Sequence, residues 1–289
     1  MSEVTNLKQS ETKIYIEGIL ASKEFEEITD KNGNPGVKGN VMIKVDDLNT
    51  IKIKVYVGKF TKDGKENKAW AGIHTVMSEY KSIAEVGEEA ADRINTSAQF
   101  SMYRNPNGQD VVMYQSNFFN RNTKPLNPTR KFKAECFIKS KNWEVDNEGN
   151  ETGRLKIRGI APSYMGIDIL DMICPVSNEL DPNFAQDADN LFEVGSTYAI
   201  EGEIVNSRVE KKAVAALGSM TGKTEYKNEL VVTGSSPAYE DENAYDKGAI
   251  DLAIQNYEDT QAQNAARANS EKAPFQKPSA ASTGRSMTF

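Results

Sequence analysis

The segment Lys13–Lys23, KIYIEGILASK, returns in altered form at Lys131–Lys141, KFKAECFIKSK. In both copies apolar residues recur at alternate positions, which is the pattern of a β-strand with one buried face. Each copy precedes a cluster of Asn, Gly and Asp residues, which tolerate the backbone angles of hairpin turns. These clusters are Asp30–Gly36 and Asp146–Asn150. The repeat therefore predicts two related domains, each opening with a strand and a hairpin.

The elements expected after each copy come in the same order: two more strands, a short helix, a fourth strand and a fifth strand. This order is the plan of the OB-fold barrel. We therefore expect a mainly β protein with two tandem five-stranded OB-like barrels, short helices and a flexible C-terminal tail. The expected segments are Val41–Val45, Ile51–Val57, Ser78–Glu89, Ala98–Tyr103 and Asp110–Phe118 in the first half, and Leu155–Ile160, Ile167–Cys174, Asn183–Leu191, Ser196–Val205 and Glu229–Thr233 in the second.

Changes in composition set the expected domain boundaries. In the tail, Tyr239–Asp259 is acidic and has apolar residues at helical spacing, which predicts one amphipathic helix. From Thr260 onward Gln, Asn, Ala, Ser and Pro dominate, and disorder is expected. The predicted divisions are a disordered N-terminus at 1–11, OB-like domains at 12–121 and 129–236, a proline-containing linker at 122–128, and the tail at 237–289.

The composition excludes several classes of protein. The chain has 289 residues and a net charge of −7, and it holds no run of about 18 apolar residues that would cross a membrane. Its N-terminus lacks the apolar core of a secretory signal, so a cytoplasmic location is expected, the host cytoplasm if the protein is viral. In that compartment Cys136 and Cys174 are expected to be reduced and structural.

Residues suited to catalysis are scarce. His74 is the single histidine, and the segment around it predicts a strand histidine with a satisfied ring. Asp168 and Asp171 are three apart in a predicted strand, so they point to opposite faces and make a poor metal pair for a nuclease. The segment 218–224 has three residues between its glycines where a phosphate-binding P-loop requires four. We expect no catalytic residue, no metal and no cofactor.

Two cationic stripes suggest a binding surface instead. Alternation places Lys52, Lys54 and Tyr56 outward on one strand, with Arg154, Lys156 and Arg158 outward on its counterpart. Residues 51–70 hold six lysines against two acidic residues, and 129–143 hold five basic residues against one. Single strands need cations that track phosphates and aromatic rings that stack on bases. The candidate nucleic-acid-binding residues are Lys52, Lys54, Tyr56, Lys59, Phe60, Trp70, Arg130, Lys131, Lys133, Trp143, Arg154, Lys156 and Arg158.

Each of these residues also has a simpler interpretation. Alternating lysines on a strand often form a solvated face or an edge protected from aggregation. Aromatic residues in strands often belong to the core. The same question applies to the aromatic residues of the last strands expected in the first barrel, which are Tyr103, Tyr114, Phe118 and Phe119.

The segments Tyr198–Val205 (YAIEGEIV) and Asn228–Gly234 (NELVVTG) look like the fourth and fifth strands of an OB barrel. With them, residues 12–235 resemble the single-stranded DNA-binding proteins of bacteriophages, particularly those with tandem OB folds. The resemblance implies a non-enzymatic protein of DNA replication, recombination or repair, which coats single strands with little sequence preference. It also implies contact with replication or recombination proteins through the tail, where the terminal Phe289 is the candidate partner-binding residue, although no acidic run precedes it. A homo-oligomer is possible.

Two other functions stay open at this point. A structural or assembly protein of a virus, built on the same barrels without nucleic-acid affinity, would suit the acidic net charge. An enzyme such as a nuclease would need a cluster of carboxylates, and the sequence offers none. The choice between DNA and RNA is also open.

Overall fold

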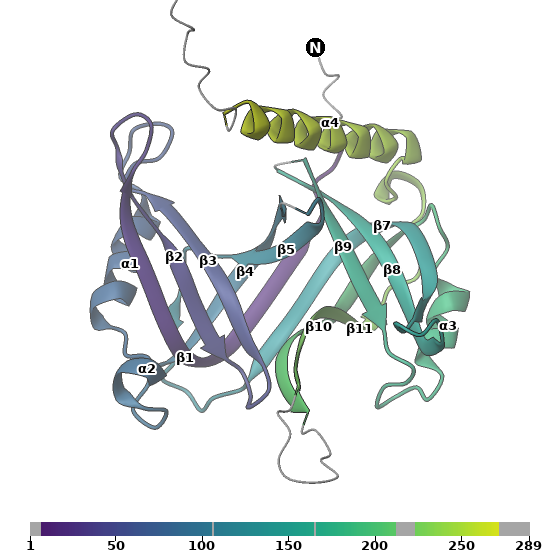
Figure 1. Cartoon of the computed structure of the whole chain (residues 1–289), viewed down its shortest axis with the longest axis horizontal. Coiled ribbons are helices and arrows are strands. Elements are labelled where there is room, and N and C mark those ends of the chain that lie inside the picture. Colours follow the sequence, from purple (N-terminus) through teal and green to yellow (C-terminus); the bar gives the residue numbers. More distant parts are fainter. Residues whose placement is uncertain (1–6, 106, 165, 212–222, 272–289) are drawn as a thin grey trace, which may run out of the picture.

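The computed structural model describes residues 7–105, 107–164, 166–211 and 223–271, and their fold is mainly β. Within these ranges, eleven strands join in one continuous sheet that curls into two barrels side by side (Figure 1). No helix in the described ranges has the length and apolar character needed to cross a membrane.

The first barrel has the strand order of an OB fold. Its strands follow one another as β1-β2-β3-β5-β4, the pairing of β1 with β4 closes the barrel, and β3 runs parallel to β5. The elements are β1 (Thr12–Thr29), β2 (Pro35–Lys44), β3 (Thr50–Gly58), α1 (Lys68–Glu79), α2 (Ile83–Val86), β4 (Arg93–Arg104), β5 (Asp110–Gln115) and the short β6 (Asn120–Arg121), which pairs with β4.

The second barrel repeats this plan. Its order is β7-β8-β9-β11-β10, closed by β7 and β10, with β9 parallel to β11. The two OB-like barrels predicted from the repeat are therefore confirmed. The elements are β7 (Thr129–Val145), β8 (Glu151–Ser163), β9 (Gly166–Cys174), α3 (Phe184–Leu191), β10 (Thr197–Lys211) and β11 (Lys223–Ser235).

The barrels meet where the two copies of the repeat pair with each other. β1 and β7 run antiparallel, and Ile14 lies opposite Phe132, its own counterpart in the repeat. Each strand also has an irregularity at the same place in the repeat, between Leu20 and Ser22 in β1 and between Ile138 and Ser140 in β7. The two copies of the sequence repeat are thus related by an approximate two-fold axis that passes between β1 and β7.

The connection between the barrels is fixed by one buried acid. The Glu17 carboxylate on β1 accepts hydrogen bonds from the Asn122 side-chain amide (2.7 Å) and the Asn127 backbone N–H (3.0 Å). Residues 7–11 also lie against the second barrel, where the Ser10 backbone N–H donates to the carbonyl of Pro162 at 2.8 Å.

Helix α4 (Lys247–Glu271) follows a short 3-10 turn (Asp241–Asn243) and crosses above both barrels (Figure 1). Ile250 and Ala253 are buried in a small apolar cluster with Phe137 and Ile160 of the second barrel, as the amphipathic pattern predicts. The expectation of disorder from Thr260 onward is wrong as far as Glu271. Gln, Ala and Arg are good helix formers, so a helix anchored by its first turns extends readily through them.

The region before β4 also differs from expectation. The segment around His74 is helix α1, not a strand, and within the range expected to be helical, Ser78–Glu89, the structure has the end of α1 and the one-turn helix α2. Ala69, Ile73 and Val76 recur at helical spacing, and the Asn67 side chain caps the helix by accepting from the Ala69 N–H at 3.0 Å. The His74 ring is not satisfied as predicted, because its buried Nε2 has no hydrogen-bond partner among the described residues.

Candidate nucleic-acid interface

The outward face of β3 carries the first predicted stripe. Ile51, Ile53 and Val55 are buried, whereas Lys52 and Tyr56 are exposed and Lys54 is half-buried, which confirms the predicted alternation. Strand pairing places Lys54 beside Gln115 of β5, and Gln115 opposite Gln99 of β4. The outward side chains of three neighbouring strands therefore share one surface, which we call the first-barrel face.

Aromatic rings border these lysines. Tyr56, Tyr103 and Phe118 are 55%, 44% and 62% exposed, large fractions for such apolar groups. The Lys54 ammonium lies 5.2 Å from the centroid of the Tyr103 ring. Two other predicted residues form a similar pair, since the Lys59 ammonium lies 5.6 Å from the centroid of the exposed Phe60 ring. Cations and ring faces are thus available together on the first-barrel face.

The other aromatic candidates lie in or against the core. Tyr114 and Phe119 are buried, and Tyr114 packs against Phe100 of the first barrel. Trp70 on α1 and Trp143 on β7 are half-buried and pack against the main apolar cluster.

The second predicted stripe lies outward on β8, but its charges are neutralised. Each of its three cations pairs with a carboxylate, whereas no acidic side chain of the described residues forms an ion pair with Lys52 or Lys54. A lysine or arginine already paired must exchange that partner for a phosphate, so it adds less to binding. The pairs are Arg154 with Glu229 (2.7 Å), Lys156 with Glu144 (3.2 Å) and Arg158 with Asp171 (2.7 Å).

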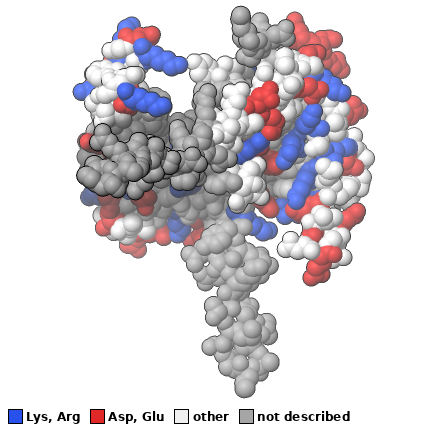
Figure 2. Space-filling view, turned by 45° about the horizontal axis from the view of Figure 1, so that its top comes forward, with Lys and Arg blue, Asp and Glu red and all other residues white. Residues whose placement is uncertain are grey.

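The cations of 129–143 are mostly paired as well. Arg130 contacts Glu203 at 3.0 Å, and Lys133 contacts Glu201 at 3.0 Å, both across the β7–β10 pairing. Lys131 is exposed, and no described acidic group pairs with it. On the side of the molecule that carries α4, Lys and Arg are interspersed with Asp and Glu (Figure 2).

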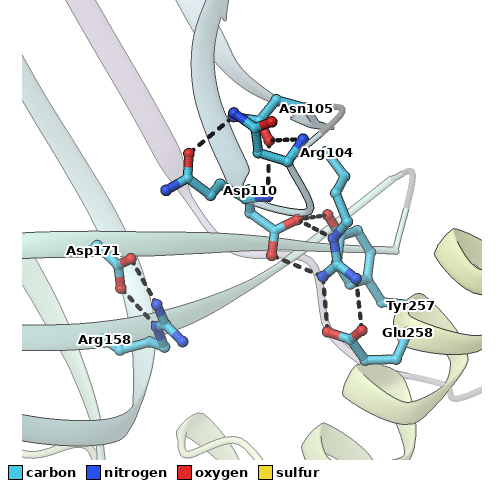
Figure 3. Close-up of polar contacts among 9 residues, drawn as sticks. Arg104, Asn105, Asp110, Arg158, Asp171, Tyr257 and Glu258 are labelled. Atoms are coloured by element: carbon cyan, nitrogen blue, oxygen red, sulfur yellow. Dashed lines mark hydrogen bonds and ion pairs between the residues drawn. The ribbon is translucent and has the colours of Figure 1, made fainter.

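The β4–β5 hairpin of the first barrel lies against β9 of the second barrel and beneath α4. The Arg104 guanidinium bonds the Asp110 carboxylate at 2.9 Å and the Glu258 carboxylate of α4 at 2.8 Å, and the Tyr257 hydroxyl donates to Asp110 at 2.7 Å (Figure 3). Burial alone would raise the pKa of Asp110, but hydrogen bonds from Arg104 and Tyr257 hold that pKa below its usual value. The Arg158–Asp171 pair lies nearby in the same view (Figure 3).

A cleft of about 1300 Å³ runs beneath α4. Its walls are the β4 and β5 part of the first-barrel face, the β8–β9 hairpin of the second barrel, and one side of α4. At the tip of the hairpin Tyr164 is 76% exposed, and the Lys62 ammonium of the first barrel lies 5.8 Å from the centroid of its ring. Sequence reasoning missed Tyr164 and the cleft, because both depend on how the second barrel packs against the first.

In the described ranges, no cluster of three His, Cys, Asp or Glu side chains has the spacing of a metal site. Cys136 and Cys174 are buried, and burial raises the pKa of the Cys174 thiol to about 12, which keeps it protonated and unreactive. Asp168 is 9% exposed in the wall of the cleft, and burial raises its pKa to about 7.

A family model described as YorF matches residues 11–271. No curated protein matches the sequence. Among solved structures, the chain is similar to the single-stranded DNA binding protein from Thermus aquaticus. A deletion mutant of that protein gives a TM-score of 0.49 at 9% identity, covering 81% of this chain and 97% of the other. The wild-type protein gives 0.47 at 9% identity, covering 81% and 96%. A replication protein A heterotrimer bound to single-stranded DNA gives 0.18 at 9% identity, covering 82% and 68%.

Proposed function

The chain belongs to the YorF family, and we propose that it binds single-stranded DNA without catalysing a reaction on it. The observation that carries this proposal is the composition of the first-barrel face. Lys52 and Lys54 have no ion pair with a described residue, and Tyr56 and Tyr103 expose their rings beside them. Cations that attract phosphates and rings that stack on bases are the two requirements of a single-strand site.

A single strand suits this surface better than a duplex does. Base faces are free to stack on protein rings only when they are not already stacked and paired inside a double helix. The side chains of Tyr56, Tyr103 and Phe118 are 55%, 44% and 62% exposed, so their ring faces are open to unstacked bases. We therefore expect affinity for flexible single strands and weak affinity for duplexes.

The net charge of −7 limits how the protein binds. Attraction cannot come from the molecule as a whole, so it depends on the local cations of the first-barrel face and falls steeply with salt. Such a protein would coat transient single strands in the cytoplasm during replication, recombination or repair, in a bacteriophage or in its host. The predicted partner-binding residue Phe289 lies outside the described residues.

A titration of the full-length protein with a fluorescent single-stranded oligonucleotide tests the proposal. The matching duplex and the RNA of the same sequence are titrated beside it, each at two salt concentrations. We expect DNA single strands to bind much more tightly than the duplex, and log affinity to fall by about 0.7 per neutralised phosphate against log salt. Equal affinity for the duplex, or a flat salt dependence, contradicts the proposal. Tighter binding of RNA reassigns the substrate, and self-association without binding favours an assembly role.

A further inference from the structure

We propose that the surface around helix α3 binds residues 272–289 of a second copy of this chain, so that neighbouring molecules on one strand are linked head to tail. We call residues 176–194, which include α3 and the loops on either side of it, the α3 surface. Self-association through this contact is independent of the proposed function, and only its consequence for DNA rests on that function.

The α3 surface exposes several large aliphatic side chains. One side of α3 packs on the second barrel through the buried residues Ala185 and Ala188. Single exposed aliphatic residues are common on proteins, but four within one segment of 19 residues form an apolar area that suits a partner. They are Val176, Leu180, Leu191 and Val194, which are 50%, 94%, 45% and 57% exposed.

The same surface is acidic and contributes no cation. Residues 159–207 contain no Lys, Arg or His. Among the acids of the α3 surface, Asp189 pairs with Lys141 at 2.9 Å, and the other four form no ion pair with a described residue. Those four are Glu179, Asp181, Asp187 and Glu193. A partner that complements this surface must therefore be basic as well as apolar.

Residues 272–289 have the complementary composition. They contain no acidic residue, and they combine three cations with three large apolar side chains. The cations are Lys272, Lys277 and Arg285, and the apolar residues are Phe275, Met287 and Phe289. Opposite charges guide two surfaces together, and apolar side chains that leave water in the contact add affinity.

The course of α4 favours the α3 surface of a second copy over that of the same chain. Ile250 and Ala253 pack on the second barrel, whereas Glu258, later in the helix, bonds Arg104 of the first barrel. The last residue of α4 therefore lies about 27 Å beyond Ala253, away from the second barrel. Helix α3 lies on the outer side of the second barrel, away from the first (Figure 1).

This arrangement suits molecules that follow one another along a strand in one orientation. The α3 surface of one copy then faces the first barrel of the next, on the side toward which α4 runs. An extended chain of 18 residues spans up to about 60 Å, so residues 272–289 can cross the junction between two neighbours.

An exchange of charges tests the contact in the full-length protein without DNA. We expect the average mass from sedimentation equilibrium at low salt to rise with protein concentration. Glu179→Lys with Asp187→Lys should weaken this association about tenfold, and Lys272→Glu with Lys277→Glu should do the same. Combining the four substitutions restores opposite charges and the wild-type net charge, so the association should return.

The matched control is Glu24→Lys with Glu27→Lys on β1. These two acids are exposed and have no ion pair with a described residue, so their reversal changes the net charge equally and should leave the association unchanged. Leu180→Asp should weaken the association without affecting thermal denaturation, since that side chain is 94% exposed.

Two results would overturn the proposal. One is a wild-type mass that stays constant with concentration, which includes the case in which residues 272–289 bind the α3 surface of their own chain. The other is an association that survives either pair of charge reversals, or that the combined variant does not regain.

The consequence for DNA is measured separately on short and long single strands. On an oligonucleotide that holds one molecule, the α3-surface variant should bind no more weakly than the wild type. On a strand that holds many, the wild type should bind cooperatively, each pair variant should lose that cooperativity, and the combined variant should regain it. Independent binding of wild-type molecules on the long strand overturns the head-to-tail link. Failure to bind either strand instead refutes the proposed function and leaves the self-association standing.

Discussion

The Arg104 guanidinium at the end of β4 and the Glu258 carboxylate on α4 are joined by two hydrogen bonds of 2.8 and 2.9 Å (Figure 3). On the second barrel, Lys139 and Asp251 of α4 form an ion pair of 2.7 Å. The carboxylates of Glu258 and Asp251 therefore connect helix α4 to both barrels, and each forms an ion pair with a cation of the barrel that it contacts.

Replacing the two α4 acids that form these ion pairs, Asp251→Asn with Glu258→Gln, is expected to raise affinity for single-stranded DNA several-fold at low salt. Lys139 would then be available to phosphates, whereas Arg104 would keep its ion pair with Asp110, so the log–log salt slope should steepen by up to about 0.7. Titrations at several salt concentrations measure both quantities. The pair Glu179→Gln, before α3, with Asp187→Asn, within α3, removes the same charge and should leave the slope unchanged. A slope that both pairs change alike would mean that only net charge matters.

Removing the unpaired lysines, Lys52→Ala with Lys54→Ala, should weaken binding to every single strand and lower the magnitude of the salt slope by about 1.4. Lys156→Ala is the comparison, because Lys156 already contacts Glu144 at 3.2 Å and should contribute less per charge removed. Fluorescence titrations supply the affinities, and thermal denaturation should show little change for either variant. A larger loss from Lys156→Ala would move the site to the second barrel.

Truncating the exposed rings, in Tyr103→Ala and Phe118→Ala, should each cost about 1–3 kcal/mol of binding free energy if a base stacks there. Their effect on the free energy of unfolding should be smaller than that of a core substitution, because Tyr103 is 44% and Phe118 is 62% exposed. Tyr114→Ala should behave in the opposite way and cost about 3–5 kcal/mol of folding stability, since that ring is 4% exposed. Calorimetric binding and urea unfolding distinguish the two classes.

Asp168 should make stability depend on pH. Its pKa is about 7 in the folded protein against an ordinary 3.8, so the unfolded chain loses this proton first as pH rises. The folded state is therefore penalised progressively between about pH 4 and pH 7, and the penalty is constant above that range. Asp168→Asn should remove it, exceeding the wild type in free energy of unfolding by about 1–4 kcal/mol more at pH 8 than at pH 4. Urea unfolding of both proteins at the two pH values measures this difference. A difference between variant and wild type that is the same at pH 4 and pH 8 would contradict the assignment.

Sequence periodicity was enough for most of the fold. Alternation in Ile51–Val57, repeated in the second half, predicted which side chains of these strands face inward, because burial on one face imposes a period of two. The prediction failed around His74. The buried residues Ala69, Ile73 and Val76 recur at helical spacing there, but the segment is short enough to be read as a strand as well.

The binding surface was less predictable, because charge and exposure depend on contacts between distant strands. Arg154 and Lys54 have the same local pattern, yet only Arg154 meets a carboxylate, Glu229, from a strand far along the chain. Aromatic residues divided in a similar way. Phe118 and Phe119 follow the end of β5, where strand alternation no longer applies, and one is 62% exposed and the other buried.

The pairing of β1 with β7 makes the two barrels one stiff body and not two modules on a tether. Tethered modules can engage a polymer one at a time, and the length of polymer they cover varies with linker reach. In this protein the distance between the barrels is set by backbone hydrogen bonds before any ligand arrives. Association therefore loses no freedom of one barrel relative to the other. We therefore expect the binding-site size, the number of nucleotides occluded by each bound molecule, to be the same at every salt concentration.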